Sequence, residues 1–211
     1  MASAAAPLDT RIALLDAARQ VLHERGYAAL STREVATAAG VPLSQIHYHF
    51  GSKQGLVLAL FEYLNAQLFD RQQALFDDPS LSFADQWDRA CGYLDDDLAS
   101  GYVRIMHELS AAGWAHLDVG AVVRESLLAW TGLIAEVARR FEKKLGGFGP
   151  LSVEDIAALV GTAFIGAESL MLTGLEDCGV PIRASLRRVG ALIRALEQVK
   201  EEPHASQAAA K

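Results

Sequence analysis

Apolar residues recur along most of this chain at intervals of three and four positions, which is the spacing of one face of an α-helix. The strict apolar–polar alternation that is typical of a half-buried strand is missing from the sequence. The pattern therefore predicts an all-α protein of about nine helices, each marked by its apolar stripe and by residues that begin or end it.

The first two helices are short or moderate in length and lie close together in the sequence. One is predicted over residues 9–25, because an aspartate suited to an N-cap precedes its stripe and Gly26 follows it. The next is predicted over residues 32–39 and opens on Ser-Thr-Arg-Glu. In this pattern Ser31 and Glu34 are expected to form a capping box, each satisfying a backbone amide of the other.

Gly40 supplies a tight turn, after which a third short helix is predicted over residues 43–50. Two short helices joined by such a turn and braced by another helix form a helix-turn-helix, whose second helix enters the major groove of DNA. Val41, Ile46 and Phe50 are expected to anchor the second helix on the other two. The polar side chains between them are left for the groove.

The later helices are longer and resemble those of a bundle. Ser52, Ser82 and Ser152 each precede an apolar stripe and are expected to act as N-caps. The longest stripe predicts a helix from about Leu117 to Leu145. Pro181 stands at the first turn of the last predicted helix, where proline is tolerated.

These elements predict three segments. Residues 9–52 form an N-terminal three-helix DNA-binding domain of the helix-turn-helix type. Residues 53–200 form a C-terminal helical bundle for ligand binding and dimerisation. Residues 201–211 are polar and rich in alanine, and are expected to form a disordered tail.

The charge is unevenly divided between these segments. Residues 1–53 carry five basic and four acidic side chains, a net charge of +1, whereas the remainder carries 14 and 22, a net charge of −8. The total is −7. A polyanion would be repelled by the second part and tolerated by the first, so the distribution permits DNA binding at the N-terminal segment.

Other features of the sequence indicate a cytoplasmic protein with no membrane partner. No uninterrupted apolar run reaches the ~18 residues that a membrane-spanning helix needs, and the N-terminus lacks the basic and apolar regions of a secretory signal. Cys91 and Cys178 stand apart without CxxC spacing, so both are expected to be reduced thiols.

The stretch "ALSTREVATAAGVPLSQIHYHFGSKQGLVLALF", residues 29–61, resembles the DNA-binding domain of the TetR (tetracycline-repressor) family. The resemblance covers residues 10–64. The matching residues are Thr32, Val35, Ala36, Ala39, Gly40, Val41, Tyr48, His49, Phe50, Lys53 and Leu56. The resemblance implies a homodimeric regulator, most often a repressor, that binds a palindromic operator. It also implies that a small-molecule effector, bound in the C-terminal helical domain, releases the regulator from the operator.

The resemblance also implies which side chains meet DNA. They are Thr32, Arg33, Leu43, Ser44, Gln45, His47, Tyr48, His49 and Lys53. Tyr48 and Lys53 would hold phosphates, and Gln45 is suited to bidentate reading of adenine, worth about 1–3 kcal/mol of discrimination. Pro42, Leu43 and His47 depart from the residues usual in the family, so the resemblance does not carry over a base preference.

The two histidines allow other interpretations. A metal pair is disfavoured because positions i and i+2 diverge on a helix. General-base catalysis is disfavoured because no nucleophile or orienting carboxylate accompanies them. Surface residues on a structural helix are a third interpretation. We predict no catalytic residue, no metal ligand and no cofactor, and we expect that the protein is not an enzyme.

The last two predicted helices are the expected dimer interface, because glycines inside them cost about 1 kcal/mol each unless a close approach compensates. The residues assigned to this interface are Gly161, Phe164, Ile165, Leu186, Val189 and Ile193. Packing within one chain is the alternative. An effector site is predicted where aromatic residues gather with a few polar groups. Its expected lining is Trp87, Cys91, Met106, His107, Trp130, Thr131 and Glu168; a filled core is the alternative.

Two other function classes remain open from the residues. A helical enzyme would need a convergent constellation, for which only His107 with Glu108 and His116 with Asp118 offer scattered candidates. A ligand-binding or protein-interaction module whose helix-turn-helix no longer reads DNA is the other, favoured by Pro42 and Leu43.

Overall fold

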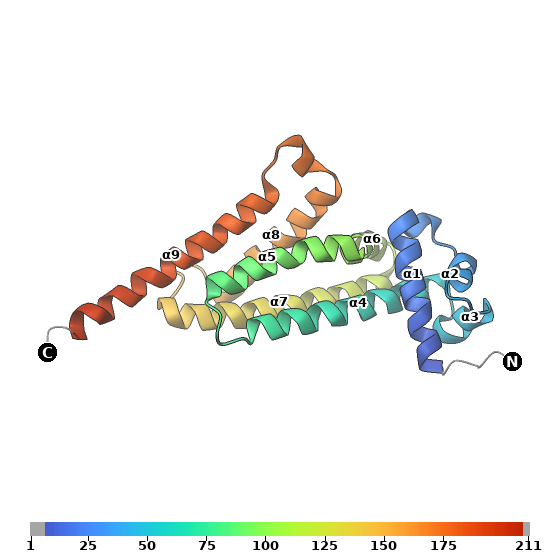
Figure 1. The fold of residues 1–211 in the computed structure, drawn as a ribbon, viewed down its shortest axis with the longest axis horizontal. Helices are drawn as coiled ribbons and strands as arrows, with labels where there is room; N and C mark the ends of the chain where they lie inside the picture. Colours follow the sequence, from blue (N-terminus) through green and yellow to red (C-terminus); the bar gives the residue numbers. More distant parts are fainter. Residues whose placement is uncertain (1–6, 209–211) are drawn as a thin grey trace. The chain divides into compact units, whose positions relative to one another are not determined.

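The computed structural model describes residues 7–208 of the 211-residue chain. Within this range it contains nine α-helices, one short 3₁₀-helix and no strand, which confirms the predicted all-α fold. The helices are α1 Pro7–Ala29, α2 Thr32–Ala38, α3 Ser44–Phe50, α4 Lys53–Phe76, α5 Phe83–Ser100, α6 Tyr102–Gly113, α7 Leu117–Leu145, α8 Val153–Leu172, η1 Leu175–Cys178 and α9 Ile182–Ala208 (Figure 1).

The three predicted serine caps are confirmed. The Oγ atoms of Ser52, Ser82 and Ser152 accept a hydrogen bond from the backbone amide three residues further on, at 3.0, 3.1 and 3.0 Å. At α8 the bond is reciprocal, because Asp155 accepts the amide of Ser152 at 2.9 Å and completes a capping box. These helices therefore begin where a local sequence signal places them.

The capping box predicted at α2 is wrong. Ser31 is the N-cap residue by backbone position, but its side chain makes no capping hydrogen bond. Glu34 turns instead to Arg25 of α1, with 2.8 Å between guanidinium and carboxylate. The competing partner comes from another helix, and the local pattern does not reveal it.

The first helix also differs from its predicted end. The helical segment continues to Ala29 across a kink at Gly26, whose φ of 76° and ψ of 171° are not helical. Glycine adopts a positive φ without the steric cost that a side chain brings. Gly26 therefore does interrupt the helix, as its position in the sequence suggests, but a further helical turn follows it.

The last helix, α9, continues to Ala208 and so extends into residues 201–211, for which the sequence predicts a disordered tail. Glutamate and alanine, which are frequent here, are good helix formers. Residues 209–211 lie outside the described part of the chain.

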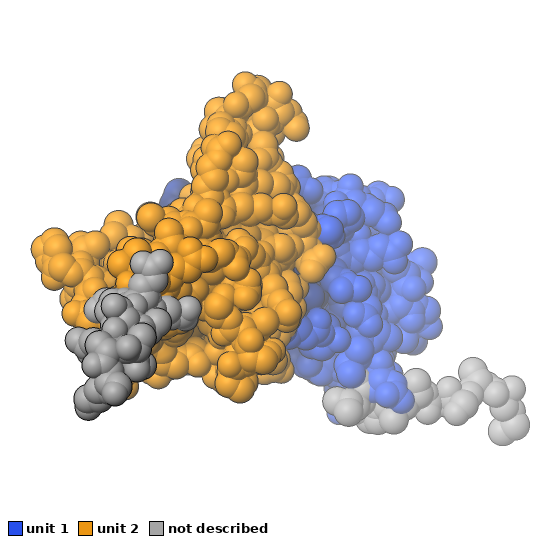
Figure 2. Space-filling view, turned by 60° about the vertical axis from the view of Figure 1, so that its left-hand side comes forward, with its two compact units in different colours: residues 1–68, 97–124 blue, residues 69–96, 125–211 orange. Residues whose placement is uncertain are grey.

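Contacts between residues divide the chain into two compact units (Figure 2). Unit 1 comprises Met1–Leu68 with Asp97–Arg124, and unit 2 comprises Phe69–Asp96 with Glu125–Lys211. Unit 1 thus holds the predicted helix-turn-helix together with α6 and the start of α7. Unit 2 holds α8 and α9. Helices α4, α5 and α7 contribute residues to both units.

In unit 1, α6 is fastened to α4 by an aromatic and a polar contact. The ring of Tyr102 stacks on that of Phe61, with 5.7 Å between ring centroids and 8° between planes. The Tyr102 hydroxyl donates to Asn65 Oδ1 at 2.9 Å. Nearer the start of α4, Gln54 donates to Asp118 of α7 at 3.2 Å. The helix that follows the helix-turn-helix is thereby tied to the later elements of its unit.

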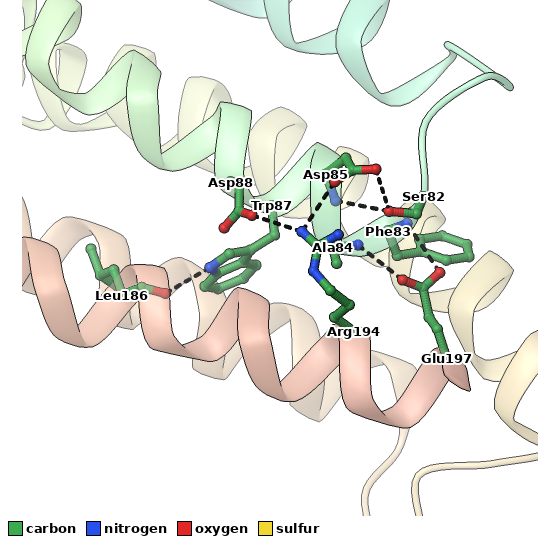
Figure 3. A network of polar contacts seen from close by, with 9 residues as sticks. All are labelled: Ser82, Phe83, Ala84, Asp85, Trp87, Asp88, Leu186, Arg194 and Glu197. Carbon is green, nitrogen blue, oxygen red and sulfur yellow. Dashed lines mark hydrogen bonds and ion pairs between the residues drawn. The ribbon is translucent and has the colours of Figure 1, made fainter. Parts of the chain in front are cut away.

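In unit 2, polar side chains of α9 hold it against α5 (Figure 3). Glu197 is buried and its two carboxylate oxygens accept the backbone amides of Phe83 and Ala84, at 3.2 and 3.3 Å. The same carboxylate pairs with Lys144 of α7 at 3.0 Å. One side chain therefore joins three helices, and it does so at the positive N-terminal end of α5.

A second set of contacts lies further along the same two helices. Arg194 of α9 bridges Asp85 and Asp88 of α5, at 3.1 and 3.0 Å (Figure 3). The indole N–H of Trp87 donates to the Leu186 carbonyl at 2.7 Å. Gly190 allows this approach, since a Cβ there would meet Asp88 Oδ1 at 2.4 Å. Its close contact is thus made within one chain.

Candidate nucleic-acid interface

The turn between α2 and α3 is fixed by two backbone hydrogen bonds. The Val41 amide donates to the Ala36 carbonyl at 3.0 Å, and the Gly40 amide donates to the Thr37 carbonyl at 3.1 Å. This is the pairing of a Schellman motif, which ends a helix with a left-handed residue. Gly40 provides that residue, with a φ of 68°. The angle at which the chain leaves α2 is therefore set by backbone geometry.

Helix α3 begins one residue later than predicted, at Ser44. Leu43 already has helical dihedral angles, φ −56° and ψ −30°. The predicted and observed starts of α3 therefore differ only in how the terminal residue of the helix is assigned. The Pro42 carbonyl accepts the Gln45 amide at 2.9 Å and starts the turn of helix. Pro42 is thus accommodated just before the helix, where its missing N–H is not required.

The rotation of α3 about its axis is set by its buried side. Ile46 is completely buried, and Phe50 is half-buried beneath the guanidinium of Arg11, 5.5 Å from the ring centroid. Ser44 and Tyr48 consequently point outward together, because residues four apart share a helical face. Tyr48 is 77% exposed. An aromatic residue with a hydroxyl on such a face is available to a partner.

All nine residues predicted to contact DNA lie in unit 1. The exposed ones are Arg33, Ser44, His47 and Tyr48, and the half-buried ones are Thr32, Leu43, Gln45, His49 and Lys53. They come from α2, α3, the turn between them and the first residue of α4. One continuous stretch, from the start of α2 to the start of α4, therefore supplies all nine residues, and Figure 1 shows α2 and α3 beside α1.

Two of these side chains have defined local contacts. His47 Nδ1 lies 3.2 Å from the Gly51 carbonyl oxygen, at the end of the same helix. The ring of His49 meets the ring of Tyr48 edge-on, with 4.9 Å between centroids. His49 Nε2 is buried without a hydrogen-bond partner in the described residues.

The residues predicted to line an effector site fall into both units. Met106 and His107 belong to unit 1; Trp87, Cys91, Trp130, Thr131 and Glu168 belong to unit 2. Within unit 2, Trp87 and Trp130 both meet the ring of Phe164 edge-on, with centroid distances of 5.4 and 6.4 Å. The structure therefore brings the two predicted tryptophans to one aromatic cluster.

Several polar atoms of these residues are used inside the chain. The Trp130 indole N–H donates to Gln72 Oε1 at 2.8 Å, and the Thr131 hydroxyl donates to the Leu127 carbonyl at 2.7 Å. Burial raises the pKa of the Cys91 thiol to about 11. Burial also lowers the pKa of His107, whose Nε2 has no partner in the described residues.

Of the six residues assigned to a dimer interface, three pack inside the chain. Gly161 lies against Trp130, whose ring a Cβ at this glycine would meet at 3.5 Å, and Phe164 and Leu186 are buried. Ile165 and Ile193 are half-buried and Val189 is exposed. The two helices present a different set of exposed apolar side chains, which sequence reasoning missed: Leu159, Leu170, Leu172, Leu192, Leu196 and Val199.

The composition of α8 carries a signal for this exposed face. The helix is long and apolar enough to cross a membrane by length and composition alone, yet only 17% of its most apolar stretch is buried in the chain. A count of uninterrupted apolar runs passes over it, because polar residues interrupt the helix. Length and composition do not distinguish a spanning helix from one that another chain covers.

In the described residues no group of three or more His, Cys, Asp and Glu side chains could hold a metal ion.

Residues 14–60 match the family model described as bacterial regulatory proteins, tetR family. Residues 14–60 are therefore assigned to the TetR family. The matched segment runs from α1 into α4 and includes the whole helix-turn-helix. The likeness to the TetR family thus lies in the part of the molecule where the predicted recognition residues gather.

Similar proteins extend this comparison. The HTH-type transcriptional regulator CymR of Pseudomonas putida is 37% identical over 98 residues, which are 44% of this chain and 47% of CymR. The chain therefore matches about half the length of that relative. A TetR-family regulator structure from Rhodococcus sp. aligns with a TM-score of 0.67 and 23% identity over 88% of this chain and 98% of the other. A regulator from Saccharomonospora viridis, solved with choline, aligns with a TM-score of 0.70 and 22% identity over 84% and 93%.

Proposed function

We propose that this TetR-family chain is a cytoplasmic, DNA-binding transcriptional regulator, a repressor that binds a palindromic operator as a homodimer and is released by a small molecule. It has no catalytic role in this proposal. The observation that carries it is the outward face of α3, on which Ser44 and Tyr48 are exposed while Ile46 anchors the helix. A recognition helix requires this division between a buried side and an exposed one.

DNA binding is tested by fluorescence anisotropy on fragments from upstream of the gene and its neighbours, and on operators selected from random DNA. The wild type is compared with Tyr48→Phe and Gln45→Ala at several salt concentrations. Tyr48→Phe is expected to weaken binding to all sequences, because its hydroxyl is proposed to hold a phosphate. Gln45→Ala is expected to relax preference at one base position by about 1–3 kcal/mol.

The contrary result is binding without sequence preference or with little salt dependence. Phosphate contacts make the affinity for DNA fall steeply as the salt concentration rises, so a weak salt dependence would mean that the helix-turn-helix does not bind the phosphates of DNA. The chain would then act as a ligand-binding or protein-interaction module.

The proposed dimer interface is the exposed apolar face of α8 and α9. Leu192 is 60% exposed on α9, and Leu159 is exposed on α8. Covering a leucine contributes about 1.5–3 kcal/mol, and a two-fold interface counts each residue twice. Leu192→Glu is therefore expected to weaken the dimer more than a hundredfold.

Sedimentation velocity measures this effect, and α7 offers a matched control. Leu128 is 65% exposed, so Leu128→Glu changes a leucine of similar exposure outside the proposed interface. We expect a dimer for Leu128→Glu and a monomer for Leu192→Glu. Equal dissociation constants for the two variants would contradict the assignment.

We further propose that residues 53–200 hold the effector, and that residues 9–52 are the DNA-binding domain it controls. The choline held by the S. viridis regulator of similar fold supports an effector in principle. Trp87, Trp130 and Phe164 form the aromatic cluster from which its lining would be drawn. The effector would shift α4, the helix that follows the DNA-binding domain, and a coupling of about 1–3 kcal/mol changes DNA affinity 5–150-fold.

Effector release is tested by the thermodynamic reciprocity between effector binding and operator binding. Compounds that raise the melting temperature are first found by screening, and their effect on operator affinity is then measured. The operator must weaken binding of an effector by the same factor by which the effector weakens binding of the operator. Ligands that bind without changing DNA affinity would refute effector release.

A further inference from the structure

His47 is the exposed residue of α3 whose chemistry is most narrowly defined by its contacts. It follows the buried Ile46 directly and lies three positions after Ser44, on the outward side of the helix. Its Nδ1 atom lies 3.2 Å from the carbonyl oxygen of Gly51. A carbonyl oxygen can only accept a hydrogen bond, so the proton of this contact is on Nδ1.

Two hydrogen bonds join His47 to Gly51, one through the backbone of His47 and one through its ring. The Gly51 amide donates to the His47 carbonyl at 3.1 Å, while His47 Nδ1–H donates back to the Gly51 carbonyl. Gly51 has φ 72° and ψ −46°, a conformation that residues with side chains rarely adopt. This backbone geometry places the carbonyl where it accepts from the imidazole. The contact thus selects one tautomer of the neutral ring.

In that tautomer Nε2 carries a lone pair and no proton. The major groove presents hydrogen-bond donors only at the exocyclic amines, adenine N6 and cytosine N4. Guanine O6 and thymine O4 are acceptors at the same edge. An Nε2 acceptor therefore favours an amino base and opposes a keto base at the position it faces, whereas Gln45 could present either an oxygen or an amide N–H.

We infer that His47 determines operator specificity by accepting a hydrogen bond from the exocyclic amine of adenine or cytosine in each half-site. This inference rests on the DNA binding proposed above. An acceptor that faces another acceptor loses its partner on leaving water, a cost that corresponds to roughly 5–150-fold in affinity. The expected code at this strand position is adenine or cytosine against guanine or thymine.

The test begins with operators selected from random DNA by the wild type, His47→Phe and His47→Gln at about pH 8, where imidazoles are ordinarily uncharged. The wild type is expected to select an amino base at one position of each half-site. His47→Phe keeps a ring but has no acceptor, and is expected to lose that preference alone. His47→Gln can turn either end of its amide, and is expected to accept amino and keto bases.

A base analogue then isolates the amine. At the selected position, unsubstituted purine replaces adenine, or 2-pyrimidinone replaces cytosine, so that the amino group is removed. The wild type is expected to lose about 5–150-fold in affinity and His47→Phe less than about twofold. Thermal unfolding of the three proteins is expected to coincide, because the side chain of His47 is exposed.

The outcomes separate the inference from the function on which it rests. A wild type that selects no operator overturns both. An operator whose amino preference persists in His47→Phe overturns the inference and leaves the regulator intact. The same holds if His47→Phe weakens all sequences equally and lowers the salt slope by about one, which would identify a charged imidazole on a phosphate.

Discussion

Replacement of Glu197 by alanine is expected to remove a contact that joins α5, α7 and α9. Only 5% of this residue is exposed, and its carboxylate accepts two backbone amides at the start of α5. Loss of a capping acceptor costs about 0.5–2 kcal/mol. Loss of a negative charge at a helix N-terminus costs about 0.3–1 kcal/mol more.

The ion pair with Lys144 adds less, because the lysine side chain is 36% exposed and solvent screens the pair. A pair of this kind contributes up to about 1 kcal/mol. Glu197→Ala is therefore expected to lower the free energy of unfolding by about 1–4 kcal/mol, or the Tm by roughly 2–16 °C for a chain of this length. Glu197→Gln keeps an acceptor and the side-chain volume, and should lose about half as much.

Urea unfolding followed by circular dichroism measures these losses. All variants are compared at one protein concentration, since any dimer makes stability concentration-dependent. Arg194→Ala is the matched control, because Arg194 also joins α9 to α5 but does so at the surface, where ion pairs add little. Equal losses for Glu197→Ala and Arg194→Ala would refute the reasoning that burial and capping make Glu197 the stronger contact.

Two further predictions concern single residues. Gly190→Ala should lower the free energy of unfolding, since its Cβ would lie 2.4 Å from Asp88 Oδ1. Gly132→Ala, where the Cβ would have no neighbour within 4 Å, should raise it by up to about 1 kcal/mol. Thermal unfolding measures both changes, and a destabilised Gly132→Ala variant would contradict the helix-propensity argument. Cys178 is exposed and should react quickly with a thiol reagent at pH 8, whereas Cys91, with a pKa of about 11, should remain protonated and react only on unfolding or as the pH approaches 11. Mass spectrometry of the labelled chain identifies the modified cysteine, with Cys178→Ser as the control. Modification of Cys91 at pH 8 would contradict this prediction.

Local signals in the sequence predict most of the helical architecture. The caps at Ser52, Ser82 and Ser152 form the predicted hydrogen bonds, and α7 spans Leu117–Leu145 as its stripe indicates. Each depends on residues within one or two turns. Such interactions are visible along the chain without knowledge of its packing.

Errors arise where a distant residue competes with a near one. Glu34 has a local partner in Ser31 by pattern, but Arg25 of another helix takes it. Gly190 is a point of close approach, as its helical position indicates, although the helix that it meets lies in the same chain, and at Gly161 a Cβ would make only an ordinary contact, at 3.5 Å from Trp130. Glu197 carries no signal, because a glutamate on a polar stretch looks like any solvated residue until α5 is placed beside it.

In the candidate site, too, local features are predictable from the sequence and features that depend on the folded structure are not. Spacing and resemblance are enough to predict the turn of the helix-turn-helix and its outward residues. The hydrogen bond from His47 to Gly51 is not predictable in this way, because it depends on the glycine's backbone dihedral angles at the end of α3. The exposed apolar set on α8 and α9 depends on which side of each helix the chain itself covers, and that requires the packed structure.

The hydrogen bonds across the turn at Gly40 have an evolutionary consequence. They join residues at fixed separations, so inserting or deleting one residue between Ala36 and Val41 would break the pairing and rotate α3 by about 100°. Exchanges at Ser44, His47 or Tyr48 leave this frame in place. Descendants of this gene would therefore acquire new operators by point substitution on one helical face, while lineages with altered turn length would be lost.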